Sequence, residues 1–268
     1  VYQSFLDDNR ETDGTAIDVL RTTAEIYDQR LNKVDEAKDC YRRLLAADNE
    51  DMAAFDPLEA MLTRAEAWSD LLVVYRDAVT QTLNDGRKKQ LLFKISRLEE
   101  ERLYELPAAI RTYREILDLD SDDEDATLQL DRLYGDLSRW QDLSELLMRR
   151  IEKAERNQQP EVWTELKLRL GDLYEQQLSD LNRAIDCYEE VLQRDANNST
   201  AVGALERLLS GLGERHALRF RVAQILEPIY KASDAWAKLA GVYEVHLLFI
   251  DDKARRVELL REISRLEE

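Results

Sequence analysis

The chain has 268 residues, of which 44% are hydrophobic and 35% are charged, with a net charge of −18 and only eight glycines and four prolines. This composition supports a folded core, but the scarcity of turn-forming residues argues against a sheet protein. A surface this acidic repels nucleic-acid phosphates, and no apolar run approaches the roughly 18 residues of a membrane span.

Helical periodicity runs through the sequence, and no segment alternates with the period of two that strands require. Pro107 and Pro160 fall where a first helical turn is expected, and there the missing N–H costs nothing. Asp56-Pro57 could likewise start a helix, whereas Pro228 falls inside an expected helix and should kink or split it. Helices are expected to begin near Thr15, Val34, Asp51, Ala67, Arg87, Pro107, Asp123, Arg139, Pro160, Leu181, Ser199, Glu214, Asp234 and Asp252.

Three stretches align without gaps from residues 37, 109 and 184: AKDCYRRLLAAD, AIRTYREILDLD and AIDCYEEVLQRD. Each carries a tyrosine four residues after its first alanine and an apolar pair seven and eight residues after that alanine. These positions share one face of a helix, so the stretches are equivalent helices of an internal repeat.

A second series ends in tryptophan, at Trp68, Trp140 and Trp236, each preceded by a leucine ten residues earlier. The sequence ISRLEE follows 27 residues after the first and the third of these tryptophans, at 95–100 and 263–268. One unit therefore has about 72 residues and four helices, and the third has an added helix and loop between Ala201 and Val222. The three tryptophans are expected to be the largest side chains in a continuous core between stacked hairpins.

The hairpins that begin at Leu20, Leu92 and Lys167 resemble tetratricopeptide repeats. That motif has a small residue in its first helix, here Ala24, Ser96 and Gly171. It has an aromatic residue three positions later, here Tyr27 and Tyr174, but Glu99 in the middle copy. The second helix supplies the alanine and tyrosine of the three aligned stretches.

The resemblance, which is to the tandem arrays found in large bacterial proteins, implies an all-α fold. The implied architecture is a right-handed superhelix, or α-solenoid, of antiparallel helix hairpins with a concave groove that binds other proteins. It covers residues 1–268 as one elongated domain, with units at about 15–86, 87–159 and 160–250 and a partial unit at 251–268.

Both ends of the sequence lie inside repeat units. Residues 1–6 match 74–79, which follow a tryptophan, and the chain stops at the second ISRLEE. We therefore expect a fragment of a longer array, with apolar surface at its ends that favours end-to-end self-association. No signal peptide or transmembrane segment is visible, which favours the cytoplasm, although Val1 rather than Met opens the chain.

Catalytic and metal-binding motifs are missing from the sequence. His216 and His246 leave little for zinc or acid–base chemistry, and Cys40 and Cys187 are expected to be small packing residues. The Gly-x-Gly at 211–213 follows a helix and so predicts a helix end rather than a nucleotide site. DSDDEDA at 120–126 lacks calcium-loop spacing, so it is expected to be a loop and helix N-cap. The glycosylation sequons in NNST at 197–200 have a meaning only on a secretory route, and no cofactor is expected.

The groove is the remaining candidate site. The motif's groove positions are three before, one after and four after the small residue of each first helix. They are Arg21, Glu25, Asp28, Phe93, Arg97, Glu100, Leu168, Asp172 and Glu175. The sequence thus favours a non-catalytic scaffold that binds a partner protein or peptide along the groove. An array that assembles end to end is the alternative, and RNA processing is a third possibility that the charge disfavours.

Overall fold

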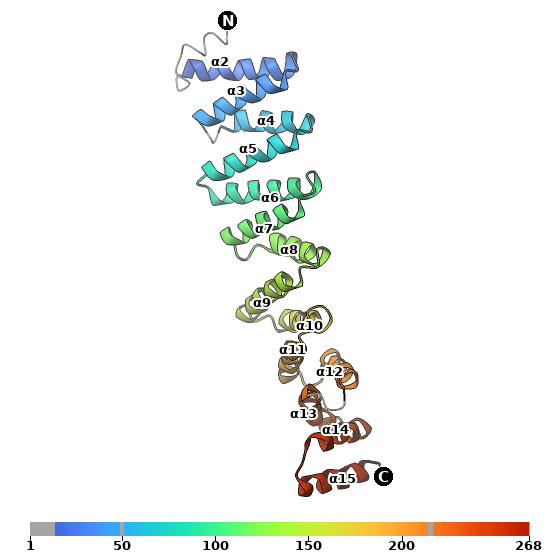
Figure 1. Cartoon of the computed structure of the whole chain (residues 1–268). Coiled ribbons are helices and arrows are strands. Elements are labelled where there is room, and N and C mark those ends of the chain that lie inside the picture. The colour runs from blue at the N-terminus through green and yellow to red at the C-terminus, as the bar shows by residue number, and fades with distance from the viewer. Residues whose placement is uncertain (1–13, 49–50, 214–216, 268) are drawn as a thin grey trace. The chain divides into compact units, whose positions relative to one another are not determined.

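A computed structural model describes residues 14–48, 51–213 and 217–267 of the chain (Figure 1). Throughout these ranges the chain forms α-helices and no strand, which confirms the all-α expectation. The helices are α2 (Gly14–Glu25), extended by a π-helical turn η1 (Ile26–Arg30), α3 (Val34–Ala47), α4 (Met52–Arg64), α5 (Trp68–Gln81), α6 (Asp85–Glu101), α7 (Leu106–Leu119), α8 (Glu124–Asp136), α9 (Trp140–Arg156), α10 (Pro160–Gln176), α11 (Leu181–Arg194), α12 (Ser199–Gly211), α13 (Ala217–Ala232), α14 (Trp236–Phe249) and α15 (Lys253–Glu267).

The helix starts agree with the sequence expectations to within two residues wherever the structure describes them. The start expected near Glu214 and the residue His216 lie outside the described residues. The added helix of the third unit is also confirmed, because α12 ends at Gly211 and α13 follows before α14. Asn198 caps α12, since its side chain accepts a 3.1 Å hydrogen bond from the backbone N–H of Ala201.

Each repeat closes its hairpins through the same strained turn. Asn32, Tyr104 and Ser179 have φ values of 50°, 56° and 54°, a left-handed conformation that non-glycine residues seldom adopt. Their spacing in the chain is that of the three aligned stretches. In each turn the residue after the left-handed one donates its N–H to a carbonyl of the preceding helix, as Glu105 does to Glu99 at 2.7 Å. The repeat units therefore share the backbone geometry of this turn as well as their sequence pattern.

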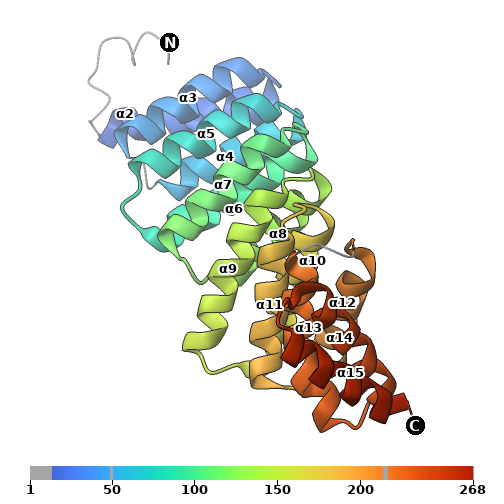
Figure 2. The same ribbon diagram turned by 60° about the horizontal axis from the view of Figure 1, so that its bottom comes forward.

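The chain divides into two compact units, one ending at Leu133 and the other starting at Tyr134. In the first unit, α2, α4 and α6 lie in one layer and α3, α5 and α7 in another (Figures 1 and 2). The apolar stripes meet between the layers, where Tyr41, Leu58 and Ile116 are almost completely buried. We call the first of these layers the α2–α4–α6 layer.

In the second unit consecutive helices also pack on one another. Helix α10 contacts α9 and α11, and α13 contacts α11, α12 and α14. Tyr188, Leu226 and Trp163 are buried in this unit. The leucine that precedes each tryptophan by ten positions is thus a core residue in all three copies, since Leu58 and Leu130 are buried as well.

Two prolines behave differently from the sequence expectation. Pro57 does not start a helix, because α4 already begins at Met52. Pro228 does not split its helix, because α13 continues from Ala217 to Ala232 around it. Each proline removes one backbone hydrogen bond, but the buried side chains before and after it hold the segment in one helix.

The expectation that the repeated tryptophans fill the core is wrong. Trp68 and Trp140 are half-buried, and Trp236 is 45% exposed. Each is the first residue of its helix, two positions after a left-handed turn residue, and so it lies at the edge of the helix packing. The fourth tryptophan, Trp163, is the buried one, and the remaining core volume is filled mainly by leucine and tyrosine.

Candidate functional site

A small residue on one helix receives the tyrosine of the next helix in the three hairpins α2–α3, α6–α7 and α10–α11, which we call the tyrosine hairpins. In the third hairpin the contact is close, since a Cβ added to Gly171 would lie only 2.6 Å from the Tyr188 ring. Ala24 and Ser96 hold the equivalent place and are completely buried. The small residue therefore sets how closely each helix pair can approach.

The tyrosine hydroxyls point toward the acidic groove positions. The Tyr188 hydroxyl lies 2.9 Å from a carboxylate oxygen of both Asp172 and Glu175. Burial and these two carboxylates raise the pKa of Tyr188 far above its ordinary value. In the first hairpin, burial together with Asp28 and Glu25 raises the pKa of Tyr41 to about 12. Both tyrosines are therefore neutral at physiological pH, and the Tyr188 hydroxyl donates to the carboxylates beside it.

The acid at the last groove position of each tyrosine hairpin pairs with an arginine two helices further along the chain. The pairs are Asp28–Arg64, Glu100–Arg132 and Glu175–Arg207. Glu59 of α4 makes a similar bridge, because it accepts from the Tyr75 hydroxyl at 2.6 Å and from Lys94 at 2.7 Å. These acids therefore join neighbouring hairpins and are engaged within the fold.

The other predicted groove residues divide into paired and exposed positions. Arg21 contacts Asp51 at 2.7 Å, and Phe93 lies half-buried with its ring centroid 6.3 Å from that of Tyr113. Leu168 is half-buried. Glu25 and Arg97 are exposed, on α2 and α6 of the same layer, and neither forms an ion pair with another described residue. The structure thus leaves these two charges available to a ligand in the first unit.

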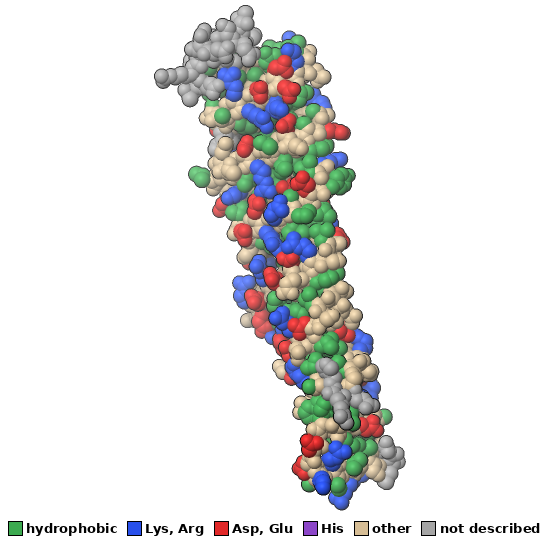
Figure 3. Space-filling model, in the orientation of Figure 1, with side chains coloured by type: hydrophobic (Ala, Val, Ile, Leu, Met, Phe, Trp, Pro, Cys, Tyr) green, Lys and Arg blue, Asp and Glu red, His purple; other side chains and the backbone are tan. Residues whose placement is uncertain are grey.

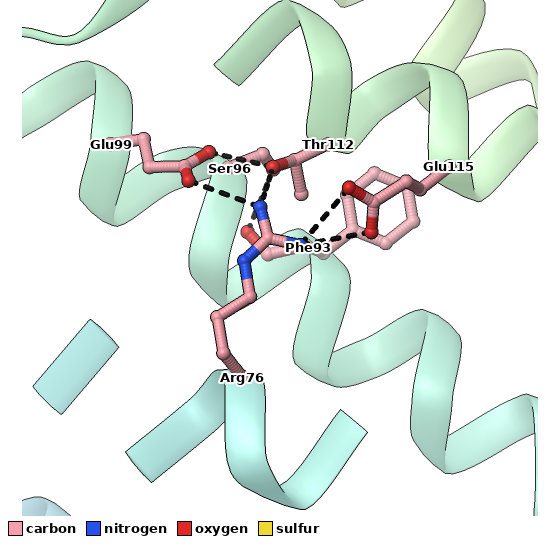
Figure 4. Close-up of polar contacts among 6 residues, drawn as sticks. All are labelled: Arg76, Phe93, Ser96, Glu99, Thr112 and Glu115. Carbon is pink, nitrogen blue, oxygen red and sulfur yellow. Dashed lines mark hydrogen bonds and ion pairs between the residues drawn. The ribbon is translucent and has the colours of Figure 1, made fainter. Parts of the chain in front are cut away.

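An ion cluster around the buried carboxylate of Glu99 explains why Glu99 replaces tyrosine in the middle hairpin (Figure 4). The guanidinium of Arg76 on α5 donates to both oxygens of Glu115, at 2.9 and 3.1 Å, and to Glu99 at 3.1 Å. Thr112 accepts from Arg76 and donates to Glu99 at 2.7 Å. Glu99 and Thr112 are buried, so Arg76 neutralises a carboxylate that has almost no access to water.

The same three positions are apolar in the next copy. Met148, Tyr174 and Cys187 stand where the middle copy has Arg76, Glu99 and Thr112. The Tyr174 hydroxyl lies 3.9 Å from the Met148 sulfur, and burial raises the pKa of the Cys187 thiol to about 11. Sequence reasoning noted Glu99 as a departure from the motif but missed its partners, which come from two other helices.

The remaining candidates do not form a catalytic arrangement. Cys40 and Cys187 are free, buried thiols, which confirms their packing role. His246 is buried beside Glu227, at 3.5 Å, and burial lowers its pKa. Asp123 caps α8 by accepting from Ala126 at 2.8 Å and also pairs with Lys89. Among the described residues, no group of three or more His, Cys, Asp or Glu residues is placed to hold a metal ion.

Acidic and basic side chains are interspersed over the helices in the face that Figure 3 shows. A pocket of about 300 Å³ in the second unit is lined by seven residues of α9, α10, α11 and the α9–α10 turn. Arg194 lies over the Trp163 ring there, 3.5 Å from its centroid, and pairs with Glu155 at 2.6 Å. The charge of Arg194 is therefore paired within the pocket, by the Glu155 carboxylate and the Trp163 ring. None of the described helices has the length and apolarity needed to cross a membrane.

Residues 164–198, which include most of the third tyrosine hairpin, match the tetratricopeptide repeat family. This match supports an array of tetratricopeptide-like repeats. No curated protein sequence matches it. Similar solved structures include YrrB, a tetratricopeptide protein with an unusual peptide-binding site, at 13% identity and a TM-score of 0.35, covering 77% of this chain and 98% of YrrB.

Two further solved structures are similar to this chain at low identity. The TPR2AB domain of yeast Sti1, in a complex with pHSP90, is 12% identical over 96% of this chain and 100% of its own, with a TM-score of 0.35. A human IFIT1 dimer with m7Gppp-AAAA is 16% identical over 90% of this chain and 56% of its own, with a TM-score of 0.40. At these low scores no neighbour identifies a ligand for this array.

Proposed function

We propose that the chain is a non-catalytic scaffold whose α2–α4–α6 layer binds a segment of a partner protein. The observation that carries the proposal is the division of the groove positions into internally paired acids and exposed charges. Ion pairs from α4 to α2 and from α6 to α4 fix the helix spacing, while Glu25 and Arg97 stay exposed. The tetratricopeptide-like fold itself suggests a protein-interaction scaffold.

The groove surface of the first unit has opposite charge at its two ends. Glu25 gives α2 an exposed acid, while α6 presents Arg97 one turn after the half-buried Phe93. A complementary segment would place an acidic residue opposite Arg97, an apolar side chain on Phe93 and a basic residue toward Glu25. The net charge of −18 supports a protein partner over a nucleic acid.

The proposal can be tested without a known partner. A displayed library of random peptides would be selected on the full chain, and the enriched peptides would be measured against Arg97→Glu and Arg111→Glu. Arg111 is an exposed arginine on α7, in the other layer, and so serves as the matched control. We expect Arg97→Glu to abolish binding and Arg111→Glu to leave it unchanged. Enriched peptides that are insensitive to Arg97→Glu would show that the groove is not the binding surface.

A further inference from the structure

The first tyrosine hairpin differs from the other two in the helix that supplies a cation to its acids. In the second and third hairpins the last groove acid accepts from an arginine 32 residues further along the chain, Arg132 on α8 and Arg207 on α12, at 2.5 and 3.4 Å. The residue 32 positions after Asp28 is Ala60, which is exposed on α4. The first copy thus has an exposed alanine where the other two copies use an arginine.

Arg64 of α4 makes only part of the contact that these arginines make. It reaches Asp28 at 3.4 Å, and its own side chain is 63% exposed. Glu25, three residues before Asp28, is exposed and forms no ion pair with another described residue. The equivalent acid of the third hairpin, Asp172, lies 3.5 Å from Arg207. Glu25 therefore lacks the cation that its counterpart has.

The hydroxyl of Tyr41 is a second and independent sign of an unfilled position. Tyr41 is only 1% exposed, and its hydroxyl has no hydrogen-bond partner within the described part of the chain. Burial together with Asp28 and Glu25 raises the pKa of Tyr41, so the hydroxyl faces these two acids. In the third hairpin the Tyr188 hydroxyl lies 2.9 Å from both equivalent carboxylates. Because an unpaired buried hydroxyl costs free energy, a movement of Glu25 toward Tyr41 is favourable.

We infer that Glu25 and Asp28 bind the guanidinium of an arginine side chain in the partner segment, at the position that Ala60 leaves open. This inference rests on the proposed function, because the site lies on the α2–α4–α6 layer. Arginine fits because the other two copies place one there, and because a planar guanidinium can hydrogen-bond two carboxylates at once. The bound cation draws Glu25 inward, where its carboxylate accepts from the Tyr41 hydroxyl.

The probe is N-acetyl-arginine amide, titrated into the full chain with isotope-labelled tyrosine rings and followed by NMR. The Tyr41 signal is identified by its loss in Tyr41→Phe, and we expect it to shift in a saturable way. N-acetyl-citrulline amide has nearly the same shape without the charge. It should bind at least about tenfold more weakly, because hydrogen bonds between a cation and a carboxylate are the strong ones.

Three variants locate the bound cation. Ala60→Arg supplies the arginine of the other copies and should weaken binding of the probe about tenfold or more. Ala46→Arg is the matched control, because Ala46 is an exposed alanine on α3, in the other layer, and the change adds the same charge. It should alter binding less than about twofold, since separated exposed charges are largely screened. Glu25→Gln keeps the size of the side chain and should weaken binding about fivefold or more.

The three substituted positions are exposed, so circular dichroism should show an unchanged fold in each variant. Equal binding of the arginine and citrulline probes, an unmoved Tyr41 signal, or equal binding by Ala60→Arg and Ala46→Arg would overturn the inference. The two proposals can also fail separately. Library-selected peptides that are sensitive to Arg97→Glu but not to Ala60→Arg would overturn this inference alone, whereas peptides insensitive to both changes would overturn the groove proposal with it.

Discussion

The Arg76 cluster gives a prediction whose size follows from the structure. Arg76→Met removes the cation from Glu99, whose side chain is only 4% exposed, and leaves the carboxylate with the hydrogen bond that Thr112 donates to it. Breaking a buried ion pair costs about 3–5 kcal/mol of folding free energy. Arg76 itself is 34% exposed, so water can partly reach the site and we expect about 2–3 kcal/mol.

The next copy of the repeat shows which substitutions should compensate for the loss of Arg76. The next copy has Met148, Tyr174 and Cys187 at these positions, so Arg76→Met combined with Glu99→Tyr and Thr112→Cys installs an arrangement that already packs elsewhere in the array. We expect this triple variant to recover the unfolding free energy to within about 1 kcal/mol of the original, because replacing a buried ion pair by well-packed apolar groups is often neutral.

Unfolding in urea, followed by circular dichroism, measures these free energies. Hydrogen exchange on α5, α6 and α7 is also needed, because repeat arrays can unfold in parts and so depart from two-state behaviour. Arg97→Met, on the exposed face of α6, is the control and should change stability by less than about 0.5 kcal/mol. Two results would contradict this account of the cluster. One is a loss of unfolding free energy in Arg76→Met that is as small as in the control, and the other is a triple variant that is no more stable than Arg76→Met alone.

Three further outcomes are expected. Gly171→Ala should destabilise the third tyrosine hairpin by about 1–3 kcal/mol in urea unfolding, because its Cβ would meet the Tyr188 ring at 2.6 Å; an unchanged midpoint would contradict this. Trp163→Ala should cost about 3–5 kcal/mol and Trp236→Ala much less, since their exposures are 3% and 45%, and equal losses of melting temperature would refute the assignment. Burial lowers the pKa of His246 in the fold, so its contribution to stability is complete above the unfolded pKa of about 6.5 and is lost as pH falls below it; His246→Phe should flatten this part of the stability–pH curve, and an unchanged curve would exclude His246 as the cause.

The sequence predicts the helices and their order because those properties are local or periodic. Helix starts follow caps, prolines and apolar stripes, and the offsets between repeats reappear in the left-handed turns at Asn32, Tyr104 and Ser179. The burial of Tyr41 and its equivalents also follows from the stripe. Local pattern was thus sufficient for the positions of the helices and for the burial of the tyrosine stripe, although it misjudged the two prolines inside α4 and α13.

Properties that depend on a second or third helix could not be predicted in this way. Trp68 belongs to the repeat as regularly as Tyr41 does, but its place at the first position of a helix keeps it at the edge of the packing. The groove rule identifies Glu100 correctly as a first-helix acid, yet Arg132 engages it from 32 residues away. Spacing within one motif does not show which side chains a neighbouring hairpin uses.

The middle tyrosine hairpin differs from its neighbours in a way that matters for an array of similar units. The repeats have the same apolar stripe on their helices. A hairpin that packs on the wrong neighbour during folding would therefore bury almost as much apolar surface as in the native pairing. Glu99 opposes such a slip, since a buried carboxylate placed beside Cys40 or Cys187 would lack the arginine that neutralises it. We hypothesise that the Arg76 cluster contributes specificity of pairing more than stability.

This hypothesis predicts how the triple variant refolds, which its equilibrium stability alone does not show. With Arg76, Glu99 and Thr112 converted to the residues of the next copy, two tyrosine hairpins become chemically alike at these positions. Refolding from urea should then yield more mispaired monomer or hairpin-exchanged dimer than the original chain, at equal unfolding free energy. Size-exclusion chromatography of the refolded protein at several concentrations measures this yield, and single-mixing kinetics show whether a slow phase appears. If the triple variant refolds with the same yield and rate as the original, the ion cluster only joins three helices and does not direct their pairing.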